Sequence, residues 1–380
     1  MSRQERPRIL FVSPTAESTG PTTSLGLLLD RLVDGIHEAQ ALVSGKGAFL
    51  EALHARSVPY EQFAWPKAQP WTTRLSETHR LLRWFRKERF TLVYANEASG
   101  ATRNVCLAAK LAGTPFVCHV RSMGWRHGWK HLGFLRAASA VVAVSNACAS
   151  SVERHVRPGR LHVVHNGIAP PELPPDRREE QARIKSELGL DPSTRLIFNV
   201  GHLTPRKGQE YALEAMKIML SEGADVHLCL AGAHDRDPDY VRAIEEEAAR
   251  PPLAGHVTLL GFRSDVGRLL IGGDILLHTA LLDPHPRSVL EGMAAALPVV
   301  AFSTDGVAET VVHGETGYLV AKENASGLAS SVLRLIHEDQ GERLGLAGRH
   351  RVEAEFSEVQ TADRVATILR RVLDEVDASV

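Results

Sequence analysis

The sequence predicts an α/β protein made of two doubly wound domains, each with a parallel sheet covered by helices. Strand-length apolar runs alternate with helical periodicity through both halves of the chain, which is typical of parallel sheets with helices on both faces. A proline-rich stretch within residues 166–182 separates the two series. The length of 380 residues also suits two domains, because single hydrophobic cores stop growing at about 250 to 300 residues.

The composition is that of an ordinary globular protein and argues against several classes. With 44% hydrophobic residues and a net charge of −1, the chain lacks the basic excess of most nucleic-acid-binding proteins. The 4 cysteines show no C-x-x-C spacing, so they suit core positions in a reducing compartment better than disulfides or a zinc site. No apolar run approaches the roughly 20 residues that span a membrane, and the first residues lack a signal-peptide core. We therefore expect a cytoplasmic protein.

The first half begins with a predicted strand over residues 8–15, a turn that contains Gly20, and a helix over 24–33. A doubly wound nucleotide-binding domain begins with this order of strand, glycine-containing turn and helix. A single glycine, however, also fits an ordinary turn between a strand and a helix. The alternation continues with strands predicted at 37–45, 91–97, 115–122 and 140–145, and helices at 49–56 and 101–113.

Residues 74–90 predict a basic amphipathic helix with apolar residues between its arginines. Such a helix can lie on an anionic bilayer surface. It can equally pack on the sheet and leave its basic side in solvent.

The second half restarts after the proline-rich linker, which divides the chain near residue 170. Strands are predicted at 195–201, 225–232, 256–261, 274–280 and 298–303, with a closing segment at 314–320, and helices at 210–220, 241–249 and 266–273. Residues 356–376 carry apolar side chains at helical spacing, which predicts one amphipathic helix packed on the body of the protein.

The stretch 279–298 is the most informative part of the chain. It contains the exit of a buried strand, a turn with Asp283, and a helix expected to open near Ser288 and to include Glu291. The start of such a helix presents unpaired N–H groups and a partial positive charge, which suit an anionic ligand. Asp283 and Glu291 can then face the same crevice. Alternatively, Ser288 and Glu291 form a capping box, and Asp283 simply favours the turn.

The loop at residues 201–208 (GHLTPRKG) places Arg206 and Lys207 just before a predicted helix. Cations are unfavourable at a helix N-terminus, and a bound phosphate would offset that conflict. A solvated basic loop is the other interpretation.

His119 and Arg121 share one face at the end of a predicted strand, because side chains alternate along it. His119 could reach the crevice at that end of the sheet. It could also be a core histidine with satisfied hydrogen bonds.

Taken together, residues 199–320 resemble the second domain of the retaining glycosyltransferases of the family 4 type, which have the GT-B fold. The elements HVR, VAVSNA and VVHNG extend a looser resemblance over the first half, so nearly the whole chain is covered. The resemblance implies two Rossmann-like domains facing a central cleft. Residues 1–168 would bind the acceptor, 169–355 the nucleotide-sugar donor, and 356–380 would form a helix that packs back towards the first domain.

The resemblance also implies roles for single residues. Glu291 matches the acid that binds the ribose, and Asp283 takes the place of the acid that holds hydroxyls of the donor sugar. Lys207 matches the lysine that neutralises the diphosphate, with Arg206 beside it, and His119 matches a histidine near the transferred sugar. The remaining donor-side matches are Gly20 in the first turn, His202, and the turn of His285, Pro286, Arg287 and Ser288 with its backbone N–H groups.

Three departures from the family pattern stand out. Asp283 is shorter than the usual glutamate, and His202 replaces the usual arginine. The family histidine could align with Arg121 in place of His119. These departures affect the identity of the donor more than the fold.

The implied activity is transfer of a sugar from a nucleotide-diphosphate sugar to a hydroxyl acceptor, with retention of configuration and with neither metal nor cofactor. The acceptor would be a glycan, a lipid-linked intermediate or a small molecule, with Arg121, Trp125 and Arg126 on the acceptor side. Peripheral contact with the inner face of the membrane through the first domain fits the basic helix. Alternatives are a degenerate GT-B scaffold subunit and a nucleotide-sugar epimerase. For a transferase, we expect replacement of Lys207 by alanine to lower the rate far more than the stability.

Overall fold

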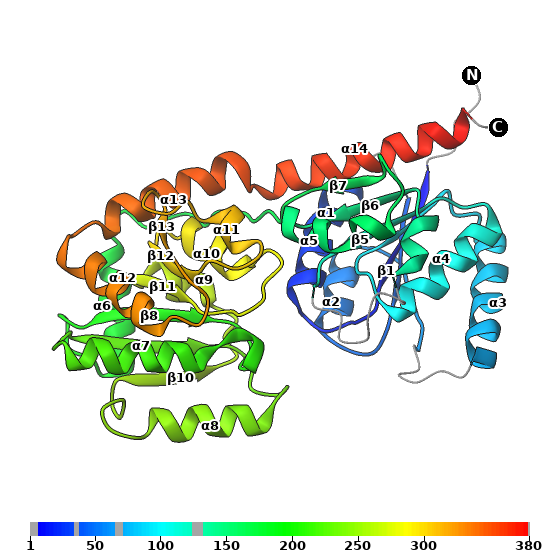
Figure 1. The fold of residues 1–380 in the computed structure, drawn as a ribbon. Coiled ribbons are helices and arrows are strands. Elements are labelled where there is room, and N and C mark those ends of the chain that lie inside the picture. Colours follow the sequence, from blue (N-terminus) through cyan, green and yellow to red (C-terminus); the bar gives the residue numbers. More distant parts are fainter. Residues whose placement is uncertain (1–6, 34–37, 65–70, 124–131, 379–380) are drawn as a thin grey trace. The chain divides into compact units, whose positions relative to one another are not determined.

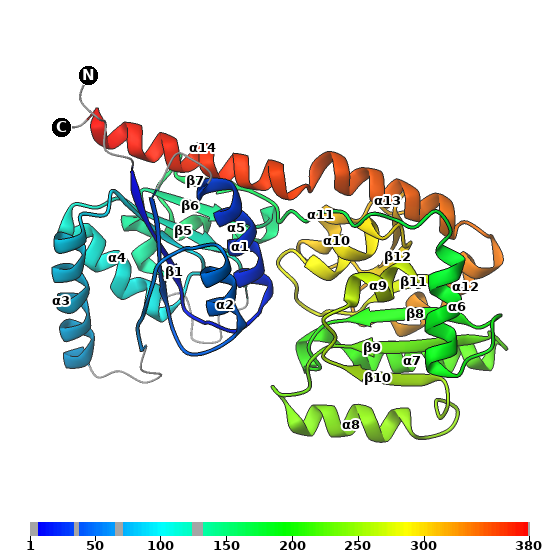
Figure 2. The same ribbon diagram turned by 180° about the vertical axis from the view of Figure 1, so that it is seen from behind.

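The computed structural model describes residues 7–33, 38–64, 71–123 and 132–378, and the chain divides into two compact units. Unit 1 runs over Met1–Gly167 and Glu358–Val380, and unit 2 runs over Ile168–Ser357. Each unit contains one parallel β-sheet with helices on both faces (Figures 1 and 2). The predicted α/β class is therefore confirmed.

Among the described residues, the sheet of unit 1 has 7 strands in the order β3-β2-β1-β4-β5-β6-β7, and all of their pairings are parallel. The strands are β1 (Arg8–Ser13), β2 (Glu38–Val43), β3 (Tyr60–Gln62), β4 (Leu92–Ala95), β5 (Phe116–Val120), β6 (Ala140–Ala143) and β7 (Leu161–Val163). The edge strand β3 and the strand β7 were not predicted from the sequence.

Helices cover both faces of this sheet because side chains along each strand alternate between two cores. Leu10 and Val12 of β1 face one core, whereas Ile9 and Phe11 face the other. The first face is covered by α3 (Trp71–Glu88), α4 (Gly100–Ala112) and α5 (Asn146–Val152), with the 3₁₀ turns η2 (Gly133–Ala137) and η3 (Glu153–His155). The second face is covered by α1 (Gly20–Val33), α2 (Ala48–Ala55) and α14 (Glu358–Asp377).

The sheet of unit 2 has 6 strands in the order β10-β9-β8-β11-β12-β13. The strands are β8 (Arg195–Val200), β9 (Val226–Ala231), β10 (Val257–Gly261), β11 (Ile275–His278), β12 (Val299–Phe302) and β13 (Gly317–Val320). The helices are α6 (Arg177–Leu188), η4 (Pro205–Lys207), α7 (Gln209–Ser221), α8 (Pro238–Ala248), α9 (Val266–Ile271), α10 (Arg287–Ala294), α11 (Val307–Thr310), α12 (Ala325–His337) and α13 (Gly341–Glu355).

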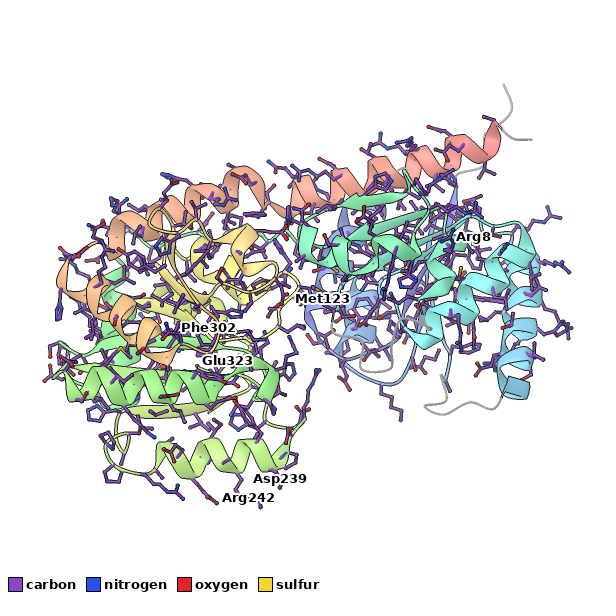
Figure 3. All side chains as sticks on the ribbon, in the orientation of Figure 1. Arg8, Met123, Asp239, Arg242, Phe302 and Glu323 are labelled. Carbon is purple, nitrogen blue, oxygen red and sulfur yellow. The ribbon has the colours of Figure 1, made fainter. Side chains whose placement is uncertain are left out.

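Two cores also fill unit 2, one on each face of its sheet. Helices α7, α8 and α12 pack on one face, and α6, α9, α10 and α11 pack on the other, while α13 contributes to both. Phe302 of β12 lies in the interior with its ring centroid 5.5 Å from that of Tyr211, whereas Asp239 and Arg242 point outward from α8 (Figure 3). The strands of unit 2 are therefore buried in its cores, and the loops at their carboxyl ends are the segments that can form a site.

Two predicted boundaries are wrong. Gly20 is the first residue of α1 and not part of the preceding turn. The charged run assigned to the linker is the first turn of α6, which begins at Arg177 because the Asp176 side chain accepts the Arg178 N–H and caps it. Acidic residues also favour this first turn through the helix dipole.

The C-terminal helix belongs to unit 1, although the residues before it belong to unit 2. Val365, Leu369 and Val372 of α14 are buried in a core of unit 1, as their helical spacing predicted. Likewise, α3 packs on unit 1 through Leu81 and Phe85, so its packed interpretation is correct. All four cysteines are free and buried, which confirms the expected core positions.

Candidate active site

The sheet of unit 2 has a topological switch point between β8 and β11. The chain proceeds from β8 to β9 on one side and from β10 to β11 on the other, so the loops after β8 and β11 leave the sheet in opposite directions. Ligands of doubly wound sheets bind outside the carboxyl ends of the strands at such a point. The loop at 201–208 follows β8, and the turn at 279–286 follows β11.

These two segments are joined by hydrogen bonds. Thr279 Oγ1 donates to the carbonyl of Lys207 at 3.0 Å, and the Leu281 N–H donates to the carbonyl of Arg206 at 2.9 Å. Gly208 permits the close approach, since it has a φ of +64° and a Cβ there would lie 2.3 Å from the Thr279 carbonyl oxygen. The basic loop and the acidic turn are consequently held against each other.

Lys207 and Asp283 form an ion pair at the centre of this arrangement. Lys207 Nζ donates to Asp283 Oδ2 at 2.6 Å, and the side chains are only 14% and 9% exposed. Burial alone would raise the pKa of Asp283, but the charge and the hydrogen bond of Lys207, with the charge of Arg206, hold that pKa below its ordinary value. Asp283 is therefore a carboxylate at neutral pH.

His278 is a further member of the cluster that the sequence did not single out. Its Nε2 lies 3.6 Å from Asp283 Oδ2, too far for a hydrogen bond. Burial, reinforced by the positive charge of Lys207, lowers the pKa of His278 to about 3, so the ring is neutral. The residue stands in an apolar strand run, where no local signal distinguishes it from core residues.

Arg206 and His202 complete the basic loop. Arg206 is exposed, and its Nη1 donates to the Leu282 carbonyl at 2.6 Å. Burial and the neighbouring cations Arg236 and Lys207 lower the pKa of His202. Because His202 is neutral near pH 7, the positive charge of this loop comes from Arg206 and Lys207.

The capping box proposed for Ser288 and Glu291 is absent. Helix α10 begins at Arg287, its cap residue is Pro286, and no side chain caps it. Ser288 is thus the second helical residue and Glu291 the fifth, so Glu291 is not a capping glutamate. No side chain caps the first N–H groups of α10, and the start of a helix is a place where an anion can bind.

Glu291 lies one turn into α10 with 35% of its side chain exposed. Its Oε1 is 3.7 Å from Arg287 Nη2. The surrounding protein raises the pKa of Glu291 by desolvation, although Arg287 and Lys207 oppose that effect. An accessible carboxylate next to two cations can accept hydrogen bonds from ligand hydroxyls.

The side chains of His285 and Pro286 are buried. His285 Nε2 lies 3.4 Å from Thr310 Oγ1, and its ring centroid is 5.6 Å from that of Phe356. These contacts hold the His285 side chain, and with it the turn, against the body of unit 2. The backbone of the turn, more than its side chains, is the part that can meet a ligand.

In unit 1, the side chain of His119 is buried, with 1% exposure. Its Nδ1 lies 2.5 Å from Tyr94 Oη. Burial raises the pKa of Tyr94 to about 12 and lowers that of His119 well below its ordinary value, so both groups are neutral. The phenol therefore donates to Nδ1, and the ring proton lies on Nε2, which has no protein partner among the described residues.

Arg121, two residues further, lies just beyond the end of β5 and is half-buried. Its guanidinium donates to Asn96 Oδ1 and to Asn166 Oδ1, both at 2.9 Å. Trp125 and Arg126 lie outside the described residues. Of the predicted acceptor-side residues, only Arg121 can therefore be placed.

The described residues contain no group of three or more His, Cys, Asp or Glu side chains that could hold a metal ion. Within the same ranges, no helix has both the length and the apolar character needed to cross a bilayer.

Two family models together cover most of the chain. Residues 180–351 match the glycosyl transferases group 1 family, and residues 19–170 match glycosyltransferase family 4. The α-maltose-1-phosphate synthase of Mycobacterium tuberculosis is 33% identical over 260 residues, which is 64% of this chain and 66% of that protein.

Solved structures share the fold at low sequence identity. Anabaena Alr3699/HepE in complex with UDP-glucose has a TM-score of 0.84 and 23% identity, with 96% of this chain and 99% of that chain covered. WaaG, a glycosyltransferase involved in lipopolysaccharide biosynthesis, has a TM-score of 0.72 and 18% identity, with coverage of 93% and 98%.

Proposed function

Because the chain belongs to the family 4-type glycosyltransferases and has their GT-B fold, we propose that it transfers a sugar from a nucleotide-diphosphate sugar to a hydroxyl acceptor. The main support is that Lys207, Asp283 and the start of α10 all follow strands at the switch point of the unit 2 sheet. Glu291 lies one turn into that helix. Cations and the N–H groups at a helix start suit a diphosphate, and the carboxylates suit sugar hydroxyls.

In this proposal, unit 2 binds the donor. Glu291 accepts hydrogen bonds from the ribose hydroxyls, and Asp283 from hydroxyls of the transferred sugar. Lys207 and Arg206 stabilise the negative charge that grows on the leaving diphosphate, together with the N–H groups that begin at Arg287. Such preorganised charge is usually the largest contribution to catalysis in sites of this kind.

The reaction we propose retains the anomeric configuration and needs no metal. The bond between the sugar C1 and the diphosphate oxygen breaks, a bond from C1 to the acceptor oxygen forms on the same face, and the acceptor proton passes to the departing phosphate. Unit 1 supplies the acceptor side through Arg121.

A thermal-shift screen against UDP, GDP, ADP and dTDP and their common sugar conjugates tests the donor. UDP-sugars come first, because the HepE structures contain UDP-glucose or UDP. A ligand at about 100 times its Kd adds roughly 2.7 kcal/mol of stability. We expect one nucleotide to stabilise the wild type and a control variant, Glu246→Ala on α8, but not Glu291→Ala.

Activity assays separate the alternatives. Slow hydrolysis of the preferred donor without acceptor supports a transferase, and unchanged turnover in EDTA supports the metal-independent reaction. Nucleotide binding without hydrolysis or transfer would favour a scaffold subunit. Conversion of the donor to an epimer would favour an epimerase.

We also propose that unit 1 contacts an anionic membrane surface through the outer side of α3 and α4. Leu75 of α3 is 58% exposed, and Leu107 and Leu111 of α4 are 45% and 53% exposed. Arg86 connects the two helices by donating to the Leu111 carbonyl at 3.4 Å, and Lys110 is exposed beside it. Exposed leucines with adjacent cations suit the headgroup region of an anionic bilayer.

The acidic residues of these helices do not oppose this contact. Glu77 is buried and accepts a hydrogen bond from Asn104 at 3.0 Å, and Glu88 pairs with Arg8 at 3.0 Å. Helix α4 contains no carboxylate. Cosedimentation with phosphatidylglycerol vesicles should therefore show binding that weakens with salt and is lost in Leu107→Glu. Equal binding by Leu107→Glu and by the control Leu346→Glu of unit 2 would contradict the proposal.

A further inference from the structure

The loop after β12, residues 303–306, holds the turn that carries Asp283. Strand β12 pairs directly with β11, so the two loops leave the sheet side by side. Thr304 Oγ1 donates to the Ala280 carbonyl at 3.1 Å. The Asp283 N–H donates to Asp305 Oδ2 at 3.0 Å, and the Gly306 N–H donates to the Asp283 carbonyl at 3.2 Å. Both backbone polar groups of Asp283 are therefore bound by consecutive residues of one loop.

The backbone of this loop is specialised for close approach. Asp305 has a φ of +39°, a left-handed conformation that only a few per cent of non-glycine residues adopt. A Cβ at Gly306 would lie 1.9 Å from the Pro284 carbonyl oxygen, so only glycine fits there. The strained residue therefore lies immediately beside the Asp283 turn, where its side chain can reach the Asp283 N–H.

The choice of an acidic residue at position 305 has an electrostatic cost. Burial, together with the negative charge of Asp283, raises the pKa of Asp305, while the bond from the Asp283 N–H lowers it. Glycine would fit the left-handed backbone without this cost. What only a side chain can supply is the acceptor for the Asp283 N–H.

We propose that Asp305 is a positioning residue, which orients the carboxylate of Asp283 towards the transferred sugar of the donor. This inference rests on the proposed function and extends it to a residue that has no role in it so far. Asp305 fixes the backbone of Asp283, and Lys207 fixes its carboxylate from the other side. Removal of the Asp305 acceptor frees the backbone of Asp283 to rotate, so the carboxylate loses its alignment with the sugar hydroxyls.

The effect should be confined to the sugar part of the donor. The nucleoside diphosphate is assigned to Glu291, Lys207 and the start of α10, none of which has a hydrogen bond with Asp305. Loss of Asp305 should therefore leave the affinity for the nucleoside diphosphate unchanged. It should reduce the rate of sugar transfer and any additional affinity that the sugar contributes.

Three substitutions test this role. Asp305→Asn keeps a carbonyl acceptor and tolerates the left-handed backbone, whereas Asp305→Gly keeps only the backbone and Asp305→Ala keeps neither. For each variant we would measure Kd for the nucleoside diphosphate identified by the thermal-shift screen, kcat and KM for the corresponding nucleotide sugar, and Tm. We expect the Kd for the nucleoside diphosphate to stay within about twofold of the wild-type value in all three variants. The kcat/KM should fall at least tenfold in Asp305→Gly and Asp305→Ala. In Asp305→Asn it should remain within about threefold of the wild-type value.

Two outcomes would overturn the positioning role. Wild-type kcat/KM in Asp305→Gly would show that only the backbone conformation matters. A parallel loss of diphosphate binding and Tm in Asp305→Gly would show that the loop is merely structural. Failure of the proposed function is a separate result, because the wild type would then bind no nucleoside diphosphate and transfer no sugar.

Discussion

Lys207 Nζ lies 2.6 Å from Asp283 Oδ2, so the residue expected to bind the diphosphate and the residue expected to bind the sugar neutralise each other. A donor must separate them or bind around them. The pair also changes the prediction for Lys207, because its removal leaves a carboxylate that is 9% exposed without its main counter-charge. From the sequence alone, we expected replacement of Lys207 to lower the rate far more than the stability.

We predict that Lys207→Met destabilises unit 2 by about 3 to 5 kcal/mol, the typical cost of breaking a buried pair. The double variant Lys207→Met/Asp283→Asn should lose at least about 1 kcal/mol less stability than the sum of the losses in Lys207→Met and Asp283→Asn. Urea unfolding of the four proteins measures this coupling. The exposed pair Arg334–Glu338, with side chains 54% and 43% exposed, is the control and should give about 0.5 kcal/mol or less. Strictly additive losses at Lys207 and Asp283 would refute the ion pair.

The absent capping box gives a prediction for Ser288. In a capping box, Ser288→Ala would cost about 0.5 to 2 kcal/mol of stability. Because α10 has no side-chain cap, we expect Ser288→Ala and Glu291→Ala to change the free energy of unfolding by less than about 0.5 kcal/mol, while only Glu291→Ala lowers affinity for the nucleotide. Unfolding curves and nucleotide titrations of both variants would decide. A loss of stability in Ser288→Ala would restore the capping interpretation.

Much of the fold could be predicted because local apolar periodicity dictates it. The strands of unit 2 and helix α14 follow directly from runs such as 195–201 and from the spacing of Val365 and Leu369. The errors arose where one pattern fits two structures. The charged run after Pro175 resembled a linker, although Asp176 makes it the start of a helix. The S-x-x-E pattern resembled a capping box, although the helix begins one residue before Ser288.

The candidate site was predictable only in part, for a different reason. Lys207, Asp283 and Glu291 could be found because loops and helix starts after strands carry recognisable residue types. His278 and Asp305 could not, since nothing near them in sequence marks them. Their importance comes from the pairing of β11 with β12 and of β11 with β8, which brings their loops together.

Helix α14 should be required for the stability of unit 1. Leu369 is fully buried among residues of the first sheet and of α1. We predict that Leu369→Ala costs about 2 to 5 kcal/mol through lost burial and a cavity. Val359, on the same helix and 39% exposed, is the control, and Val359→Ala should change stability by about 0.5 kcal/mol or less. Equal effects in the urea unfolding of unit 1 would show that α14 is not part of its core.

His278 predicts a pH dependence of stability. Burial beside Lys207 lowers its pKa in the folded protein to about 3, whereas an unfolded histidine titrates near 6.5. As the pH falls below about 6.5, the unfolded chain binds a proton that the folded protein does not, so this group favours unfolding progressively until about pH 3. The slope from one such group approaches about 1.4 kcal/mol per pH unit. We therefore expect His278→Gln to unfold with a free energy that depends less on pH between 6 and 4, by up to that amount per unit.

The control for this prediction is His350→Gln, at an exposed position of α13 in the same unit. Other buried histidines, such as His227, whose pKa is lowered to about 4 by burial, contribute the same slope in all three proteins and cancel in the comparison. Urea unfolding at several pH values should give parallel curves for the wild type and His350→Gln and a shallower curve for His278→Gln. Three parallel curves would mean that His278 is protonated in the folded protein. The assignment of a neutral His278 would then be wrong, and Asp283 would have a second cationic neighbour beside Lys207.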